Sequence, residues 1–350
     1  MTTQQPEPPE IIDVREAHRF DEPRLEAYLS EHIAGFQGPM TVRQFDRGMS
    51  NPTFIIVAGG KEYVVRKKPP GELLKSAHAV DREYRVMKAL WESDVPVPEM
   101  FHMCEDTSVV GTEFFVMERL EGRVFTDHST AGRDATERRA MYREVMRVVA
   151  SLHAVDYEAV GLGDFGRPGT YVQRQYKRWT KQYVASQTEE IASFNKLMEW
   201  LPSQMPAAAE TTIVHGDPGL HNMMFAPDGP RIVGLLDWEI STLGNPLSDV
   251  AYFASRFYSA EPEHAVTVGR NGVPTPPELV ADYEEFSGRT VTDFPFYVVF
   301  NMYRTAAIVQ GVYYRGVQGN AASSLAINSA GTARRVSDTA WEFVQNGLPD

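Results

Sequence analysis

Residues that favour β-strands are concentrated in the first third of this chain, and that asymmetry limits the folds open to it. Thr53–Ala58 and Lys61–Arg66 are β-rich runs separated by Gly59-Gly60, a dipeptide typical of a two-residue hairpin turn. Lys75–Trp91 has the pattern of a helix, and from Ala135 onwards helical spacing dominates. We therefore predict an α+β protein with a β-rich N-terminal lobe and a mainly helical C-terminal lobe.

The change of character after residue 117 sets the predicted boundaries. Residues 1–10 are rich in Pro and Glu, and we expect a disordered tail there. Residues 11–117 would form the N-terminal lobe, and residues 118–122 a hinge. Residues 123–350 would form the C-terminal lobe, with the substrate-binding helices.

Composition and charge exclude several classes of protein. The 350 residues are 43% hydrophobic, which is enough for a large core, and the net charge of −13 argues against nucleic-acid or anionic-membrane partners. Cys104 is the single cysteine, so no disulfide framework or thiolate metal cluster is expected. The N-terminus lacks the pattern of a signal peptide, and no apolar run reaches the length of a membrane span. We expect a cytoplasmic location.

The segment from His215 to Asn222 carries the strongest functional pattern. It runs His-Gly-Asp-Pro-Gly-Leu-His-Asn, which places Asp217 and Asn222 in the form H-x-D-x-x-x-x-N. Fifteen residues after Asn222, Asp237 ends an apolar run that predicts a buried strand. Any one of these residues alone is more often a turn or cap residue. Their order, between predicted strands, favours a functional interpretation.

Phosphoryl transfer from a nucleotide requires these residue types. A carboxylate must orient the attacking hydroxyl and accept its proton, and Asp217 suits that role. Two further oxygen ligands must hold Mg²⁺ against the phosphates. Asn222 and Asp237 suit this second role, because Mg²⁺ prefers carboxylate and carbonyl oxygens. The pattern predicts a kinase that uses ATP and Mg²⁺ to phosphorylate a hydroxylated small molecule.

Two further segments follow this motif, Leu236-Asp-Trp-Glu239 and Gly244-Asn-Pro-Leu-Ser-Asp-Val-Ala251. With the motif, they resemble the aminoglycoside phosphotransferase and choline-kinase-like family, and the resemblance covers nearly the whole chain. A closer likeness is to the kinase-like module joined to some acyl-CoA dehydrogenases and to its free-standing bacterial relatives. The segments that carry this likeness are Arg66–Gly71, Ser76–Ala79, Arg82-Glu83 and Asp237–Gly244.

This resemblance implies a two-lobed, protein-kinase-like fold with a catalytic loop in the C-terminal lobe. It also implies that Asp249 braces the catalytic loop rather than touching substrate, with His215 as further structural support. A helix-borne aspartate in a surface ion pair is the alternative for Asp249.

The predicted nucleotide site draws on the N-terminal lobe. In kinases a loop between the first two strands covers the phosphates, here Arg47–Asn51, where the Ser50 hydroxyl could contact phosphate oxygens. Strand alternation places Arg66 on one face and Lys67 on the other, and we choose Arg66 as the phosphate-binding cation, with Lys67 second. Glu83 would orient that cation. The hinge would offer one backbone acceptor and one donor to adenine, at Glu118 and Leu120.

The predicted helix Tyr171–Tyr183 bears on the substrate. Its basic residues share one face at helical spacing, and they are Arg174, Lys177, Arg178 and Lys181. A solvated amphipathic helix is the more common explanation of such a face. Arg174 and Arg178 could instead meet an anionic substrate, and with the likeness to dehydrogenase-linked modules this favours a hydroxyacyl-CoA or another anionic metabolite.

Other functions remain open at this stage. The chain between Asp237 and Gly244-Asn-Pro246 is too short for the long activation loop of a protein kinase. An aminoglycoside phosphotransferase is one alternative, although its polycationic substrate would need carboxylates. A non-catalytic nucleotide-binding pseudokinase module is the other, because the presence of the motif does not prove turnover.

Overall fold

A computed structural model describes residues 10–46, 51–69, 79–126, 130, 132–206, 210–258, 268–318 and 329–349. The chain divides into two compact units. Unit 1 comprises Met1–Thr126 and Leu220–Ile240, and unit 2 comprises Asp127–Gly219 and Ser241–Asp350. Apart from Glu10, the predicted tail lies outside the described residues. Because the chain enters unit 1 again at Leu220, the two units contribute different parts of the predicted motif.

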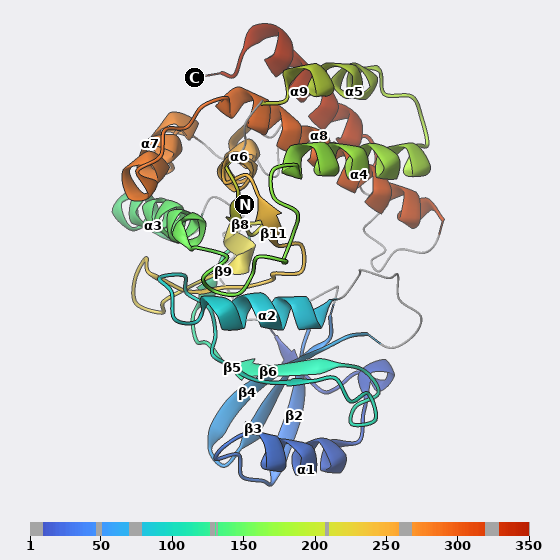
Figure 1. Cartoon of the computed structure of the whole chain (residues 1–350), viewed down its shortest axis with the longest axis vertical. Helices are drawn as coiled ribbons and strands as arrows, with labels where there is room; N and C mark the ends of the chain where they lie inside the picture. The colour runs from blue at the N-terminus through green and yellow to red at the C-terminus, as the bar shows by residue number, and fades with distance from the viewer. Residues whose placement is uncertain are drawn as a thin grey trace. The chain divides into compact units, whose positions relative to one another are not determined.

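A six-stranded antiparallel sheet forms the centre of unit 1, in the order β1-β2-β3-β4-β6-β5 (Figure 1). Its strands are β1 (Ile11–Ile12), β2 (Met40–Phe45), β3 (Thr53–Ala58), β4 (Lys61–Lys67), β5 (Met100–Cys104) and β6 (Phe114–Glu118). The predicted hairpin is confirmed, since β3 pairs with β4 across Gly59-Gly60. Both glycines have positive φ, at 57° and 75°, a conformation that the tight turn requires and that glycine adopts without strain.

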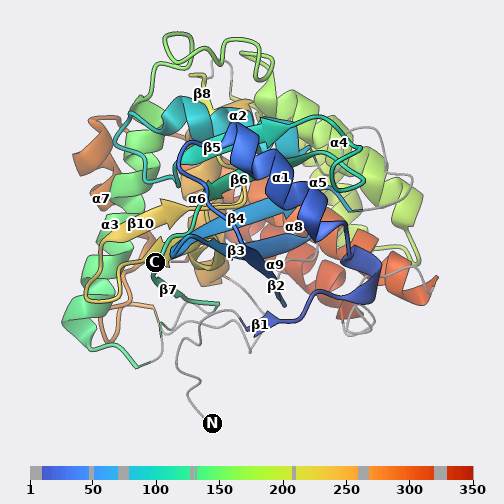
Figure 2. The same ribbon diagram turned by 90° about the horizontal axis from the view of Figure 1, so that it is seen from below.

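Two helices pack on opposite faces of this sheet. α1 (Glu22–His32) follows the short 3₁₀ helix Glu16–His18 and begins where the Asp21 side chain accepts a hydrogen bond from the Arg24 amide, 3.0 Å long. Its Leu25 and Leu29 are fully buried in a core shared with Val65, and Figure 2 shows α1 lying across that face. α2 (Val80–Leu90) packs on β5 and β6. It begins later than the predicted Lys75, and residues 75–78 lie outside the described part of the chain.

A second, three-stranded sheet in unit 1 carries the later part of the motif. Its order is β10-β9-β7, with β7 at Arg123–Val124, β9 at Met223–Phe225 and β10 at Ile232–Leu235. The 3₁₀ helix Leu220–Asn222 leads directly into β9. Asn222 and Asp237 therefore lie at the start and end of one antiparallel pair of strands.

Unit 2 is built mainly of helices around α8 (Phe294–Val317), which packs against α4, α5, α6 and α9 (Figure 1). The other helices are α3 (Ala135–Ala154), α4 (Tyr171–Ser186), α5 (Ala192–Gln204), α6 (Leu247–Ser255), the 3₁₀ helix Arg256–Tyr258, α7 (Pro276–Ser287) and α9 (Thr332–Asn346). β8 (Thr212–Val214) pairs antiparallel with β11 (Thr242–Gly244) and leads into the loop that holds Asp217. Within the described ranges, no helix combines the length and apolar character needed to cross a bilayer.

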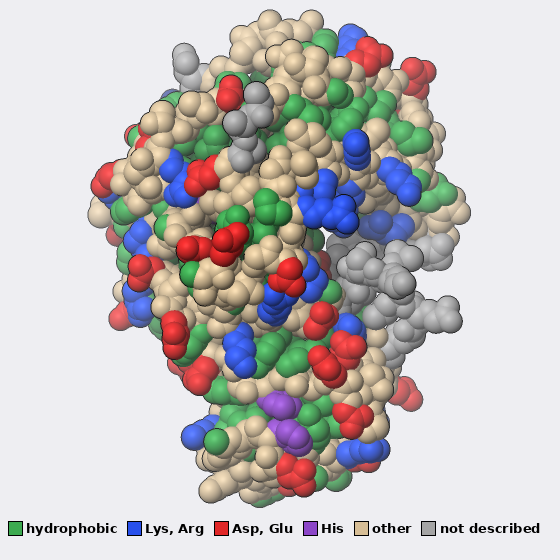
Figure 3. All heavy atoms as spheres, in the orientation of Figure 1, with side chains coloured by type: hydrophobic (Ala, Val, Ile, Leu, Met, Phe, Trp, Pro, Cys, Tyr) green, Lys and Arg blue, Asp and Glu red, His purple; other side chains and the backbone are tan. Residues whose placement is uncertain are grey.

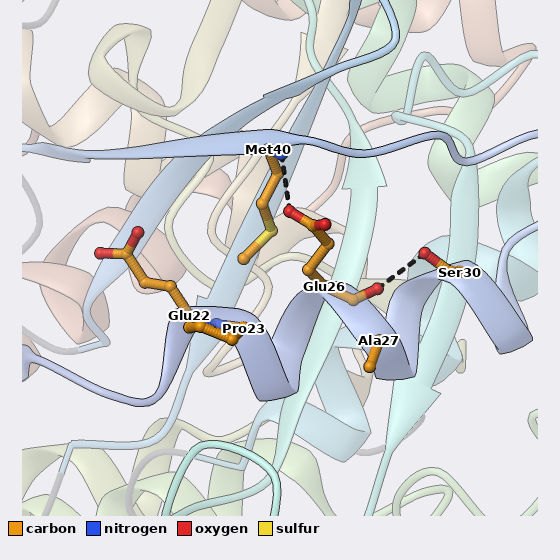
Figure 4. A pocket seen from close by; sticks show the side chains of 6 residues that line it. All are labelled: Glu22, Pro23, Glu26, Ala27, Ser30 and Met40. Carbon is orange, nitrogen blue, oxygen red and sulfur yellow. Dashed lines mark hydrogen bonds between the residues drawn. The ribbon is translucent and has the colours of Figure 1, made fainter.

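A surface depression in unit 1 lies between α1 and the start of β2 (Figure 4). Glu26 spans it, because its carboxylate accepts a 2.7 Å hydrogen bond from the Met40 amide. The residues that line it are Glu22, Pro23, Glu26, Ala27, Ser30 and Met40. None of them belongs to the predicted motif, so the candidate site is sought elsewhere.

Gly122 supplies a test of the packing between the segment after β6 and β9. A Cβ atom there would lie 2.4 Å from both the Met224 side chain and the Phe225 carbonyl oxygen. We expect Gly122→Ala to lower the free energy of unfolding by about 1–3 kcal/mol, the usual cost of overpacking. Urea unfolding would measure the loss. In the control Gly229→Ala the added Cβ meets no atom within 4 Å, so equal losses in both variants would refute this packing.

Candidate active site

In unit 2, Asp249 holds the loop that carries Asp217. Asp249 lies in the first turn of α6 and is buried. Its carboxylate accepts hydrogen bonds from two consecutive backbone amides, those of His215 at 2.7 Å and Gly216 at 2.9 Å. Hydrogen bonds to an ionised acceptor are stronger than neutral ones, so this contact anchors the chain just after β8.

Two histidines complete this buried network. The Asp217 amide donates to Nδ1 of His215 at 3.3 Å, which links the loop to its own first residue. His153, on α3, lies with Nδ1 2.9 Å from the Tyr283 hydroxyl and Nε2 3.4 Å from Asp249. His153 is thus a core residue with partners on both ring nitrogens.

The Asp217 carboxylate remains partly open, with 27% of its side chain exposed. Arg256 Nη2 lies 3.6 Å from its Oδ1 and also donates to the Tyr252 hydroxyl at 3.1 Å. Burial raises the pKa of Tyr252, and the charge of Asp217 raises it further. Sequence reasoning missed Arg256 and Tyr252, because no short-range pattern connects them with Asp217.

In unit 1, Arg66 lies between two carboxylates from different elements. Arg66 Nε is 3.1 Å from Glu83 of α2, and its Nη2 is 3.4 Å from Asp237, which follows β10. Glu83 is almost fully buried, whereas 41% of the Asp237 side chain is exposed. The arrangement leaves the Asp237 carboxylate open to a ligand while Glu83 fixes the guanidinium.

Lys67 lies on the other face of the sheet. Its Nζ donates to the Val110 carbonyl at 2.9 Å and lies 5.3 Å from the centre of the Phe20 ring, inside the core beneath α1. Alternation along β4 explains the difference, because adjacent residues point to opposite faces. Arg66, and not Lys67, is therefore the cation beside Asp237.

The charges of this cluster act on one another. Burial raises the pKa of Glu83 to about 7, against the lowering effect of Arg66. Burial alone would lower the pKa of Arg66, but the charges of Glu83 and Asp237 outweigh it and raise that pKa. Glu239 adds a further negative charge, so the cluster favours a cation.

Asn222 and Asp237 carry the oxygen types that Mg²⁺ prefers, and the backbone holds their two segments next to each other. The Leu236 backbone amide donates to the Asn222 backbone carbonyl at 2.8 Å, which holds the two segments side by side. Asp237 has a φ of 66°, a left-handed conformation that is uncommon for a non-glycine residue and that aspartate adopts more readily than most. No group of three or more metal-binding side chains occurs in the described parts of the chain.

The remaining predicted nucleotide contacts belong to the residue range of unit 1. Ser50 falls outside the described residues, but its neighbour Asn51 is buried and donates to Glu83 at 2.9 Å, a link that sequence reasoning missed. The Glu118 amide donates to the Glu99 carbonyl at 2.9 Å. Leu120 packs on β10, where a Cβ on Gly234 would come within 2.4 Å of its side chain.

The basic face of α4 is visible as a group of Lys and Arg side chains in Figure 3. Arg174 is engaged by the protein, because it donates to the Thr170 hydroxyl at 2.7 Å and to the Leu243 carbonyl at 3.3 Å. Arg178 is exposed and lies 5.1 Å from the centre of the Trp179 ring. The two predicted substrate contacts therefore differ in how much of each guanidinium a ligand could use.

Comparison with known proteins identifies the family. The profile of the phosphotransferase enzyme family matches residues 41–285. The chain belongs to this family, and its fold is protein-kinase-like, with a β-sheet N-terminal region and a helical C-terminal part.

Two individual proteins show how similar the chain is to known relatives. A solved candidate aminoglycoside phosphotransferase from Ralstonia eutropha is 44% identical, with a TM-score of 0.87 over 95% of this chain and 100% of that one. Acyl-CoA dehydrogenase family member 10 of Mus musculus is 40% identical over 96% of this chain and 32% of that protein. The chain spans 32% to 45% of the length of the curated relatives it matches.

A more distant solved structure shares the fold. It is a thermostable mutant of aminoglycoside phosphotransferase APH(4)-Ia in a ternary complex with AMP-PNP and hygromycin B. Its TM-score is 0.60 at 18% identity, over 92% of this chain and 99% of that one. The family match supports phosphoryl transfer, and this distant likeness supports the fold.

The raised pKa of Glu83 predicts a pH effect on stability. Between about 4.5 and about 7, the folded chain holds a proton on Glu83 that the unfolded chain has lost. This contribution to the free energy of unfolding therefore falls as pH rises through that window. The Glu83→Gln variant lacks this contribution, because its side chain does not titrate. Urea unfolding from about pH 5 to pH 8 should show wild type losing stability relative to the variant; parallel profiles would contradict the shift.

Proposed function

We propose that the chain is an ATP- and Mg²⁺-dependent kinase that transfers the γ-phosphoryl group to the hydroxyl of a small molecule. The observation that carries this proposal is the loop after β8. Its two buried amides bind the Asp249 carboxylate, while the Asp217 carboxylate beside them stays partly exposed. Such rigid support of a reactive group is what positioning catalysis requires.

Each predicted residue has a role in this proposal. Asp217 would orient the hydroxyl and accept its proton as the new O–P bond forms and ADP leaves. Arg66, held by Glu83, would bind phosphate oxygens, assisted by the Ser50 hydroxyl. Glu118 and Leu120 would offer backbone groups to adenine. Asn222 and Asp237 would hold Mg²⁺, which when bound neutralises charge on the phosphates.

The substrate class follows from charge and from the relatives. The basic face of α4, with Arg174 and Arg178, suits an anionic metabolite better than a polycationic antibiotic. The chain is also similar to part of proteins named acyl-CoA dehydrogenases. We therefore propose a hydroxyacyl-CoA as the leading example and a cytoplasmic setting without nucleic-acid or membrane partners.

A screen for ADP release tests this function. It would include hydroxyacyl-CoAs, free hydroxy acids, choline and kanamycin-like aminoglycosides, with ATP and Mg²⁺ throughout. We expect ADP release with an anionic acceptor. Turnover of aminoglycosides alone would contradict the substrate class, and nucleotide binding without turnover of any acceptor would favour a pseudokinase.

Asp217→Ala should separate chemistry from binding. We expect kcat to fall by roughly 10²–10⁴-fold, the range for a positioned acid–base group. Nucleotide affinity should stay close to wild type, because the predicted phosphate contacts come from other residues. Steady-state kinetics and calorimetry would measure the two effects. Wild-type turnover in this variant would rule out the role.

Asp237→Ala should abolish Mg²⁺-dependent nucleotide binding. The carboxylate would be the charged protein ligand of the metal, and it also faces Arg66 at 3.4 Å. Calorimetric titration with ATP, with and without Mg²⁺, gives the readout. Unchanged Mg-ATP affinity would show that Asp237 is not a metal ligand.

A further inference from the structure

Cations and aromatic rings alternate across unit 2 in one continuous series. The Arg178 guanidinium lies 5.1 Å from the centre of the Trp179 ring. Arg304, on α8, lies 5.7 Å from that same ring and 4.8 Å from the ring of Tyr252. The series thus leads from the exposed basic face of α4 into the interior of unit 2.

The series ends at the predicted catalytic carboxylate. Arg256 lies 5.3 Å from the centre of the Tyr252 ring and donates to its hydroxyl. It also approaches Asp217 at 3.6 Å. One tyrosine ring therefore carries two guanidinium groups, and the second of them faces Asp217.

Arg304 is the unusual member of this series. It is only 5% exposed, yet its Nε is buried without a hydrogen-bond acceptor, and no ion pair joins it to a described carboxylate. Its two ring contacts stabilise the charge but accept none of its in-plane N–H groups. A buried cation with an unpaired Nε–H donor is costly to keep, whereas a bound anion would remove that cost.

We propose that Arg304, assisted by Arg256, binds an oxyanion carried by the same molecule whose hydroxyl reacts at Asp217. The planar guanidinium fork matches a carboxylate or a phosphate, each of which accepts two parallel hydrogen bonds. The oxyanion is thus the carboxylate of a free hydroxy acid or a phosphate of a CoA thioester. This inference rests on the proposed function, because it places the anion relative to the reacting hydroxyl.

Binding without nucleotide tests the inference separately from turnover. Calorimetry would measure CoA and 3-hydroxybutyrate with wild type, Arg304→Gln, Arg304→Lys and the control Arg315→Gln, which removes an exposed cation from the same helix. Arg304→Gln should lower the affinity for one of the two probes by about 100-fold, in line with loss of a charge-assisted pair. Arg304→Lys should lower the affinity for the same probe by about 10-fold, because lysine keeps the positive charge but not the planar guanidinium fork. Arg315→Gln should bind as wild type does.

The probe whose affinity falls identifies the source of the oxyanion. A loss of CoA binding indicates a phosphate, and a loss of 3-hydroxybutyrate binding indicates a carboxylate. If Arg304→Gln fails to fold, Arg304→Lys alone decides. Wild-type affinity for both probes in the folded variants, or no binding of either probe by wild type, would overturn the inference. If Arg304-dependent binding occurs but ATP is never consumed, the kinase proposal fails and the oxyanion site stands.

Discussion

The candidate site in unit 2 depends on the two hydrogen bonds that the Asp249 carboxylate accepts from the backbone. β8 pairs with β11 only as far as Val214, so the next two backbone amides have no strand to pair with. Buried amides without acceptors are costly, and Asp249 satisfies both at once. The loop is therefore held by a side chain rather than by a sheet, and the Asp217 side chain that it carries stays 27% exposed.

The two units arrange charged side chains differently around their motif residues. In unit 1, a single guanidinium lies among Glu83, Asp237 and Glu239, so negative charge is in excess. In unit 2, the guanidinium groups of Arg304 and Arg256 lie against the Tyr252 ring, and Arg256 approaches the Asp217 carboxylate. The first environment suits a divalent cation, and the proposed oxyanion site draws on the guanidinium groups of the second. This division agrees with a reaction between a metal-bound nucleotide and an anionic acceptor.

Local patterns predicted the elements but not the contacts between them. The Gly59-Gly60 hairpin and the Tyr171–Tyr183 helix could be predicted because their turn residues and apolar spacing lie within a few positions. Alternation along β4 likewise separated Arg66 from Lys67. The motif residues could be selected, although their roles stay predictions.

Contacts between distant segments left no pattern to detect. Asn51 and Glu83 are 32 residues apart, and Arg66 and Asp237 are 171 apart. The burial of Arg304 beside Tyr252 likewise depends on how α6 and α8 pack. Packing of whole elements, rather than local propensity, decides such contacts.

Phosphorus NMR of the reaction mixture would show directly whether the γ-phosphoryl group reaches the acceptor. With ATP, Mg²⁺ and a hydroxyacyl-CoA or free hydroxy acid, the account predicts a new phosphomonoester resonance on the acceptor as ADP appears. The same mixture with Asp217→Ala should show little or none of it. Conversion of ATP to ADP and inorganic phosphate alone, or an equal phosphomonoester signal from Asp217→Ala, would contradict the account.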